Sequence, residues 1–214
     1  MKPKKNRMIL LATGALWILI ICAGIGVLWS YARTPGVAAT APEQWPSDSP
    51  LRHSADGATL VMMAHPHCPC TRASVGELAR LMAQAQGRVK AYVLFVKPSD
   101  FPDGWEKTDL SASASAIPNV TVVRDDEGVE AARFHAATSG QTMLYDARGK
   151  LLFSGGITGA RGHEGDNAGR AAIVSLLTTN ESGEKGTPVY GCPLFAGSAE
   201  CVTGKEVVRA KHEH

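Results

Sequence analysis

One uncharged apolar run near the N-terminus limits what this chain of 214 residues can be. Residues 8–29 read MILLATGALWILIICAGIGVLW and contain no charged side chain. As a helix they would be about 33 Å long, enough to cross the roughly 30 Å hydrocarbon core of a bilayer. Trp29 and Tyr31 stand at its far end, where interfacial aromatic residues are typical. The run therefore predicts a single transmembrane anchor.

The distribution of charge orients this anchor and excludes one class of partner. The chain has 22 Lys and Arg against 20 Asp and Glu. Four basic residues lie in residues 1–7, which contain no acid, so the remainder has 22 − 4 = 18 basic against 20 acidic residues. Because basic flanks stay in the cytoplasm, we expect the chain beyond residue 32 on the outer, periplasmic side of the inner (plasma) membrane. The body lacks a basic footprint, so we expect no nucleic acid as partner.

A cleaved signal peptide is the alternative to a retained anchor. The apolar region of a signal peptide usually has about 7–15 residues, fewer than are present here. The small-residue site at 39–41 is followed by Pro42, a poor context for cleavage. We therefore favour a cytoplasmic basic segment (1–7), a retained anchor (8–29) and a linker rich in Pro and Ala (30–57).

The remaining chain predicts an α/β domain over residues 58–179, followed by a Cys-containing tail, 180–214. Short apolar runs are typical of buried strands, and apolar residues at three- and four-residue spacing predict helices between them. The first helix should end at Gly87, and Asp166 or Asn167 should cap the last one. The expected strands are 58–64, 89–96, 120–123, 142–147 and 150–154.

The strongest chemical signal is a cysteine pair between the first strand and the first helix. His67-Cys68-Pro69-Cys70 fits a helix start with Cys68 as N-cap and Pro69 as the first helical residue. The Cys68 sulfur would then face the unpaired N–H groups and the positive end of the helix, which stabilise a thiolate. We therefore expect Cys68 to be the more reactive thiol.

The order of elements and the cysteine turn resemble the thioredoxin-like superfamily over about residues 55–180. Within it, the chain is similar to membrane-anchored thioredoxin-like proteins of the RedB type, through HPHCPCTRAS at 65–74 and GGITGARGH at 155–163. The resemblance implies a mixed sheet flanked by helices. It also implies thiol–disulfide exchange with exported protein thiols or disulfides, without a cofactor. Cys68 would be the nucleophile and Cys70 the resolving thiol.

Two departures from the superfamily pattern bear on mechanism. Only Pro69 separates the cysteines, and residues two apart on a helix do not face each other. A Cys68–Cys70 disulfide should thus be strained and oxidising, or Cys68 resolves against another cysteine. Where the superfamily has a cis-proline before the strand 142–147, this chain has Gln141, which favours a trans bond. How an extended substrate would be held stays open.

Histidines near the predicted site suggest further roles. His163 lies in a Gly-rich loop that should return to the cysteine turn, where it could stabilise the thiolate or move protons; a solvated loop histidine is the alternative. His65 and His67 with Cys68 and Cys70 could form a copper site, since thiolates and imidazoles suit Cu(I). We favour the interpretation that these histidines tune the thiols without metal.

Cys192 and Cys201 form a second cysteine pair in the tail. In an oxidising compartment the plain expectation is a disulfide that closes a short loop, worth about 2.5–3 kcal/mol. The alternative is a second redox pair that exchanges with Cys68.

Overall fold

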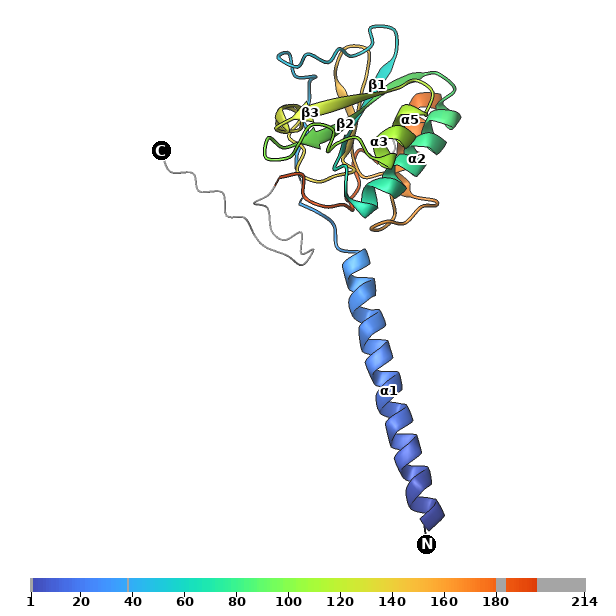
Figure 1. The fold of residues 1–214 in the computed structure, drawn as a ribbon. Coiled ribbons are helices and arrows are strands. Elements are labelled where there is room, and N and C mark those ends of the chain that lie inside the picture. The colour runs from blue at the N-terminus through green and yellow to red at the C-terminus, as the bar shows by residue number, and fades with distance from the viewer. Residues whose placement is uncertain (1, 38, 180–183, 196–214) are drawn as a thin grey trace.

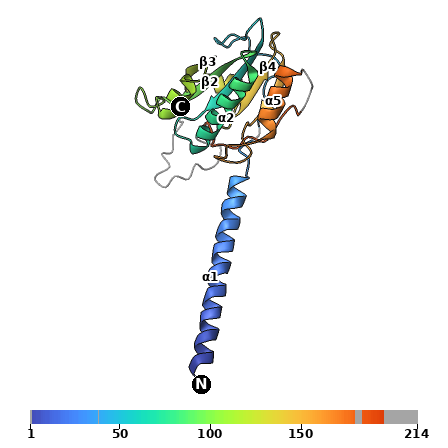
Figure 2. The same cartoon turned by 90° about the vertical axis from the view of Figure 1, so that its right-hand side faces the viewer.

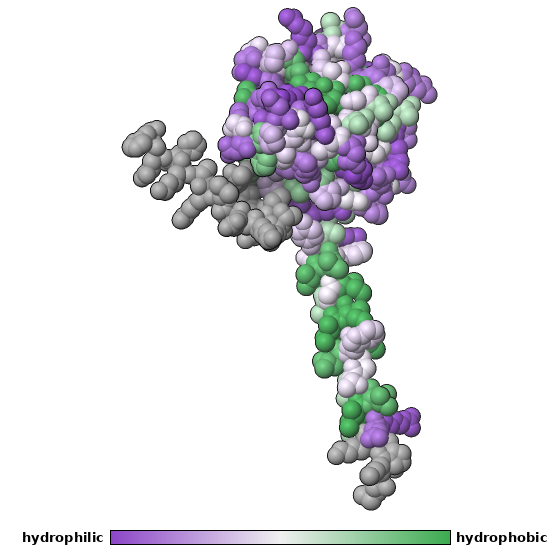
Figure 3. All heavy atoms as spheres, in the orientation of Figure 1, coloured by the Kyte–Doolittle hydropathy of each residue, from purple (hydrophilic) through white to green (hydrophobic). Residues whose placement is uncertain are grey.

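The computed structural model describes residues 2–37, 39–179 and 184–195. A single long helix, α1 (Lys2–Ala32), extends away from a compact α/β domain (Figure 1). Its segment Asn6–Ala32 has a mean hydropathy of 2.5 and is not buried by the rest of the chain, so it is long and apolar enough to cross a membrane. Apolar side chains cover this helix, whereas the visible face of the domain is mostly hydrophilic (Figure 3).

The domain is built on a five-stranded mixed sheet with the strand order β3-β2-β1-β4-β5. The first three strands are parallel, and β4 and β5 form an antiparallel hairpin that pairs with β1. The strands are β1 (Ala58–Ala64), β2 (Val89–Lys97), β3 (Val120–Asp126), β4 (Thr142–Tyr145) and β5 (Leu151–Gly155). The predicted mixed sheet is thus confirmed, with β3 longer than expected.

Helices cover both faces of the sheet. Helices α2 (Pro69–Ala85), α3 (Asp109–Ser115) and α5 (Ala168–Thr178) pack on one face, and the five-residue α4 (Val129–Arg133) on the other. Figure 2 shows α2 and α5 side by side in front of the sheet. Asn167 caps α5, because its side chain accepts a hydrogen bond from the Arg170 N–H at 2.8 Å, as predicted.

Strand β1 is buried on both faces, which explains its continuous apolar sequence. Leu60 and Met62 point into the core beneath α2 and α5, whereas Val61 and Met63 point into the second core on the α4 side. Alternate side chains of a strand point to opposite faces, so a strand between two cores has no polar face. This double burial fixes the position at which β1 ends and the cysteine turn begins.

Part of the predicted linker belongs to the folded domain. Trp45 packs edge-on against Phe134 and Tyr145, with ring centroids 5.1 and 5.2 Å away. The Tyr145 hydroxyl donates to the Pro42 carbonyl at 3.1 Å, and Ala41 is 4% exposed. Because α4 is short, it leaves part of this sheet face open, and the segment fills the space. Proline-rich composition indicated a spacer, but it cannot show that a single tryptophan packs, partly buried, against the domain.

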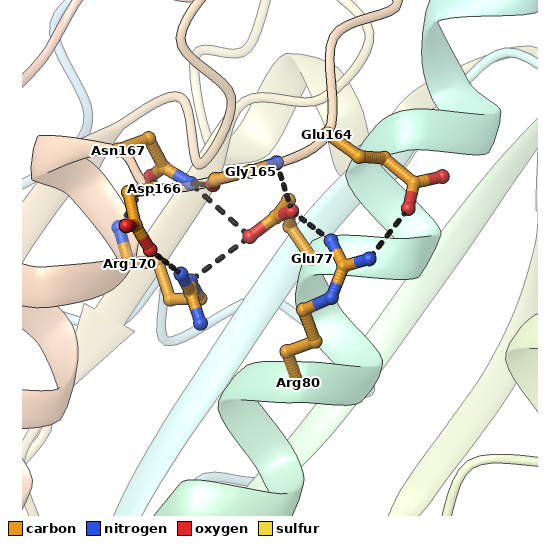
Figure 4. A network of polar contacts seen from close by, with 7 residues as sticks. All are labelled: Glu77, Arg80, Glu164, Gly165, Asp166, Asn167 and Arg170. Atoms are coloured by element: carbon orange, nitrogen blue, oxygen red, sulfur yellow. Dashed lines mark hydrogen bonds and ion pairs between the residues drawn. The ribbon is translucent and has the colours of Figure 1, made fainter.

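A buried carboxylate ties α2 to the loop before α5 (Figure 4). The Glu77 side chain is fully buried and accepts a hydrogen bond from the Gly165 N–H at 2.8 Å. Its other oxygen accepts from the Asn167 amide at 3.2 Å and lies 2.9 Å from Arg170 Nε, an ion-pair distance without hydrogen-bond geometry. Arg80 supplies a second, more exposed ion pair. Glu77 thereby holds the loop that carries Arg161 and His163.

Replacing Glu77 should strongly destabilise the domain. Glu77→Ala leaves the Arg170 guanidinium, 12% exposed, with only the exposed carboxylate of Asp166, and breaking such a buried pair costs about 3–5 kcal/mol. Denaturant unfolding of the full chain in detergent, followed by tryptophan fluorescence, measures the loss. Arg80→Ala is the matched control, because this side chain is 47% exposed and should matter much less. Equal losses in both variants would contradict the assignment.

Candidate active site

The cysteine turn has the predicted helix-start geometry. Cys68 is the N-cap of α2, with φ −87° and ψ 120°, and Pro69 follows as the first helical residue. The Thr71 N–H donates to the Cys68 carbonyl at 3.0 Å, and the Cys68 N–H donates to the His65 carbonyl at 3.2 Å. Proline suits the position after the cap because an N–H there would have no partner within the helix.

The Cys68 sulfur is buried and touches a second sulfur. Its residue is 1% exposed, and Cys68 Sγ lies 2.8 Å from Cys192 Sγ. The contact with Cys192 and, next, the contact with Cys70 hold the pKa of Cys68 far below its ordinary value, against the opposing effect of burial. The backbone N–H groups of Cys192 and Thr71 lower this pKa further. These contacts therefore act to favour the thiolate form of Cys68.

Cys70 has the opposite character. The contact with Cys192 acts to lower the pKa of Cys70, but contact with the Cys68 thiolate and burial together outweigh it, so that the pKa is raised. Arg161 lies near enough to act in the lowering direction. The pKa values of the two cysteines are thus shifted in opposite directions, downward at the helix cap and upward two residues later. That Cys68 is the nucleophile stays a prediction.

An extended segment of the tail brings Cys192 to the site. We call residues 186–195 the strap; it lies where sequence composition indicated only a tail. The Ser139 N–H donates to the Cys192 carbonyl at 2.8 Å, and Arg161 Nη1 donates to the Gly191 carbonyl at 2.6 Å. Cys201 lies outside the described residues, so the Cys192–Cys201 disulfide stays a prediction.

Gln141 occupies the place expected for it beside the cysteine turn. Its carbonyl accepts a hydrogen bond from the Met63 N–H at 2.9 Å, and the side chain is buried. The side-chain oxygen accepts from the Ala137 N–H at 3.3 Å, which braces the loop 137–141. None of the described residues has a cis peptide bond, so Gln141 keeps the trans geometry that was predicted.

The Gly-rich loop reaches the site through Arg161 rather than through His163. His163 is exposed, and no contact joins its ring to Cys68 within the described part of the chain. Arg161 instead contacts the strap at Gly191 and also donates from Nε to the Thr34 carbonyl at 3.0 Å. Loop topology predicted that this segment returns to the cysteine turn, but it could not identify the side chain that makes the contact.

His65 and His67 line the turn next to an aromatic side chain. The His67 N–H donates to His65 Nδ1 at 3.2 Å, and His67 Nε2 lies 3.0 Å from the Trp105 carbonyl oxygen. Burial lowers the pKa of His65, and the charge of Cys68 acts in the opposite direction. Among the residues that the structure describes, no group of three His, Cys, Asp or Glu side chains is arranged to hold a metal ion. The copper alternative thus stays a prediction without an assembled ligand set.

Several residues around the site carry no sequence signal. The Thr71 and Ser139 hydroxyls lie 2.8 Å apart in the interior and join the start of α2 to the loop 137–141. Ser139 Oγ also accepts from the His65 N–H at 2.9 Å. Trp105 stacks on Phe101 and faces His67 with ring centroids 4.6 Å apart. Each contact joins residues more than 30 positions apart or lies in an irregular loop, so periodicity could not predict it.

The fold has counterparts among solved structures. No protein-family model and no curated protein matches the sequence. A hypothetical protein from Sinorhizobium meliloti 1021 is similar with a TM-score of 0.58 and 19% identity, over 75% of this chain and 97% of that chain. An uncharacterized conserved protein from Geobacillus kaustophilus has a TM-score of 0.56 and 21% identity, over 78% and 95%.

A third solved structure is a secreted disulfide oxidoreductase from Mycobacterium tuberculosis that is homologous to E. coli DsbE. Its TM-score is 0.43 at 15% identity, over 70% of this chain and 98% of that chain.

The domain has the thioredoxin-like fold, as its order of elements predicted: a mixed sheet flanked by helices and preceded by one apolar helix.

The depressed pKa of Cys68 should make stability depend on pH. An unfolded cysteine titrates near pH 8.5, so the folded thiolate contributes its full stability above that pH and loses it as pH falls toward the lower folded pKa. Between about pH 5 and 8.5, the unfolding free energy of the reduced chain should therefore rise with pH relative to Cys68→Ser, by at most about 1.4 kcal/mol per unit.

Parallel denaturant titrations of the full chain in detergent at several pH values test this expectation. Cys22→Ser, in α1 and away from the site, should keep the slope of the parent chain. Identical slopes for the parent and Cys68→Ser would show that Cys68 is not a stabilised thiolate.

Proposed function

We propose that this protein is a thiol–disulfide oxidoreductase whose Cys-Pro-Cys turn reacts through Cys68. One observation carries the proposal: a sulfur with a depressed pKa sits at a helix N-cap with a second sulfur 2.8 Å away. Exchange needs a thiolate nucleophile and a neighbouring thiol that can take over the new bond. In this proposal Cys68 supplies the nucleophile and its sulfur neighbours supply the thiol, on a thioredoxin-like scaffold.

The remaining turn residues would support this chemistry without reacting. Pro69 has no backbone N–H, so the first turn has one fewer unpaired donor, and its ring fixes the backbone angle at which α2 begins. His67 is exposed beside Cys68 and next to Trp105, where its ring can contact an incoming substrate. Gln141 holds the loop 137–141 against the end of β1. The substrates would be thiols or disulfides of exported proteins.

We also propose that α1 is retained in the inner membrane with the domain on the periplasmic side. The basic residues before α1 and its apolar length support this topology. The Arg161 N–H donates to the Ala32 carbonyl at the end of α1, at 2.9 Å, and the same residue contacts the strap beside Cys192. The cysteine turn would thus lie on the membrane-proximal end of the domain (Figure 1).

Removing the nucleophile should abolish exchange. Cys68→Ser is expected to reduce the disulfide-reductase activity of the full chain to background, because no other described thiol sits at a helix cap. Reduction of insulin disulfides by dithiothreitol, with and without the purified protein, measures the activity. His67→Ala should change only the rate or the pH profile, because imidazole is not a reacting group here.

The histidine variants also separate exchange from copper delivery. Cu(I) titration against a competing chelator should show weak binding that His65→Ala and His67→Ala leave unchanged. Tight binding of one copper that is lost in either variant, together with absent reductase activity in the parent, would contradict the proposed exchange and support the copper alternative.

The topology is tested separately from the chemistry. A reporter enzyme that folds only in an oxidising compartment, fused after His214, should be active and recovered with the membranes. A soluble active fusion whose mature chain begins near Pro42 would instead establish a cleaved signal peptide.

A further inference from the structure

We infer that Cys192, carried by the strap, is the thiol that resolves Cys68, so that the oxidised protein contains a Cys68–Cys192 disulfide. The inference rests on the proposed exchange function and assigns the partner of its nucleophile. The observation behind it is the contact of the two sulfur atoms at 2.8 Å, across 124 positions of sequence. Neither cysteine has to cross a solvent gap to meet the other.

The strap is held at the site by backbone pairing. The Ser139 N–H donates to the Cys192 carbonyl at 2.8 Å, and the Leu194 N–H donates to the Ala137 carbonyl at 2.9 Å. Between these bonds Thr138 faces Pro193 in an antiparallel bridge. In this pairing the residue at position 193 donates no backbone hydrogen bond to the loop, so a proline, which lacks the N–H, loses nothing there. The loop 137–139 therefore binds an extended peptide by adding a strand, and the strap is that peptide.

Glycines let the strap approach this closely. A Cβ at Gly191 would overlap the Ser139 carbonyl oxygen, and one at Gly156 would lie 2.6 Å from the Pro188 carbonyl oxygen. The Thr187 hydroxyl also donates to the Gly156 carbonyl at 2.6 Å. The Gly-rich sequence at 155–165 therefore begins with two glycines that make room for the strap.

Cys70 is less suited to resolve Cys68. Its side chain also contacts Cys68, but it lies inside the first turn of α2, so a disulfide between residues only two positions apart would have to distort that turn. Its carbonyl accepts from Ser74 Oγ, so its backbone is engaged within the helix. Cys192 approaches Cys68 from outside the helix, and no residue of the first turn has to unwind.

The reaction balances with a protein disulfide as the oxidant. The Cys68 thiolate attacks one sulfur of the substrate disulfide, forms a mixed disulfide and releases the other sulfur as a thiolate. Cys192 then loses its proton and attacks Cys68 Sγ, which forms Cys68–Cys192 and releases the second substrate thiol. The substrate gains two electrons and the chain loses two. A substrate peptide must displace the strap from 137–139, and the returning strap expels it.

Disulfide mapping of the full chain is the first test. The chain in detergent is oxidised with glutathione disulfide, alkylated and digested without reductant by proteases that cut after Phe195 and Glu200, so that Cys192 and Cys201 separate. We expect the Cys192 peptide joined to the peptide that contains Cys68 and Cys70, with fragmentation placing the link on Cys68 and the alkyl group on Cys70; a link on Cys70 would overturn the inference. A Cys192–Cys201 link, or an alkylated Cys192 beside a Cys68–Cys70 disulfide, would overturn the inference.

Two matched variants then identify the resolving thiol. In a chain with Cys22→Ser and Cys201→Ser, we compare Cys70→Ser with Cys192→Ser. The reduced proteins react with dithiobis-nitrobenzoate, and acid-quenched samples are weighed by mass spectrometry. The Cys68 adduct should disappear with Cys70→Ser and persist about tenfold longer with Cys192→Ser, since a pre-positioned thiol acts at high effective concentration.

The opposite order, or equal persistence, would refute the role of Cys192 while leaving exchange at Cys68 intact. Absence of any Cys68 adduct in both variants would instead remove the proposed function itself.

A strap variant tests the geometry without touching a sulfur. Gly191→Ala should push the strap off Ser139, so that Cys68 in the reduced chain is alkylated several-fold faster and closes its disulfide more slowly. Gly159→Ala is the control, because its Cβ would make an ordinary contact at 3.9 Å. Unchanged Cys68 alkylation in Gly191→Ala would show that the strap does not cover the nucleophile.

Discussion

The site depends on one placement, Cys68 at the N-cap of α2 with its sulfur 2.8 Å from that of Cys192. The first N–H groups of a helix have no partner within it, so the positive helix end favours a negative sulfur at the cap, although the Cys68 side chain makes no cap hydrogen bond. Burial alone would favour the neutral thiol and raise the pKa of Cys68, but the contacts from Cys192 and Cys70, helped by the N–H groups of Cys192 and Thr71, outweigh it and lower that pKa. The double-sided burial of β1 makes the placement exact, because neither the strand nor the helix can shift without opening a core.

The sequence was sufficient to predict the parts of this arrangement that are local or periodic. The apolar run before Cys68, the N-cap with Pro69 and the Asn167 cap of α5 are confirmed. Each involves neighbours in the chain, whose geometry follows from residue type. The resemblance to the thioredoxin-like superfamily implied a mixed sheet flanked by helices, and that architecture is confirmed.

The parts that sequence reasoning missed depend on contacts between distant residues. The strap has neither helical nor strand periodicity, because it pairs with a loop and not along a strand. Trp45 fills a gap that exists only because α4 is short. Arg161 was one polar residue among several in the Gly-rich loop, and only the folded chain shows that it, and not His163, reaches the strap. Sequence reasoning gave exchange between Cys192 and Cys68 only as the alternative to a Cys192–Cys201 disulfide, and only the folded chain shows the Cys68 and Cys192 sulfur atoms 2.8 Å apart.

Arg161 connects the redox site to the helix that we propose as the membrane anchor. Its backbone N–H donates to the last residue of α1, its Nε donates to Thr34 and its Nη1 donates to Gly191 of the strap. Its guanidinium also lies 5.1 Å from the centre of the Tyr31 ring. In the proposed cycle the strap leaves its loop whenever a substrate enters, and that movement must break the Arg161–Gly191 bond. Admission of substrate is thereby linked to how the domain rests on α1, because one side chain holds both.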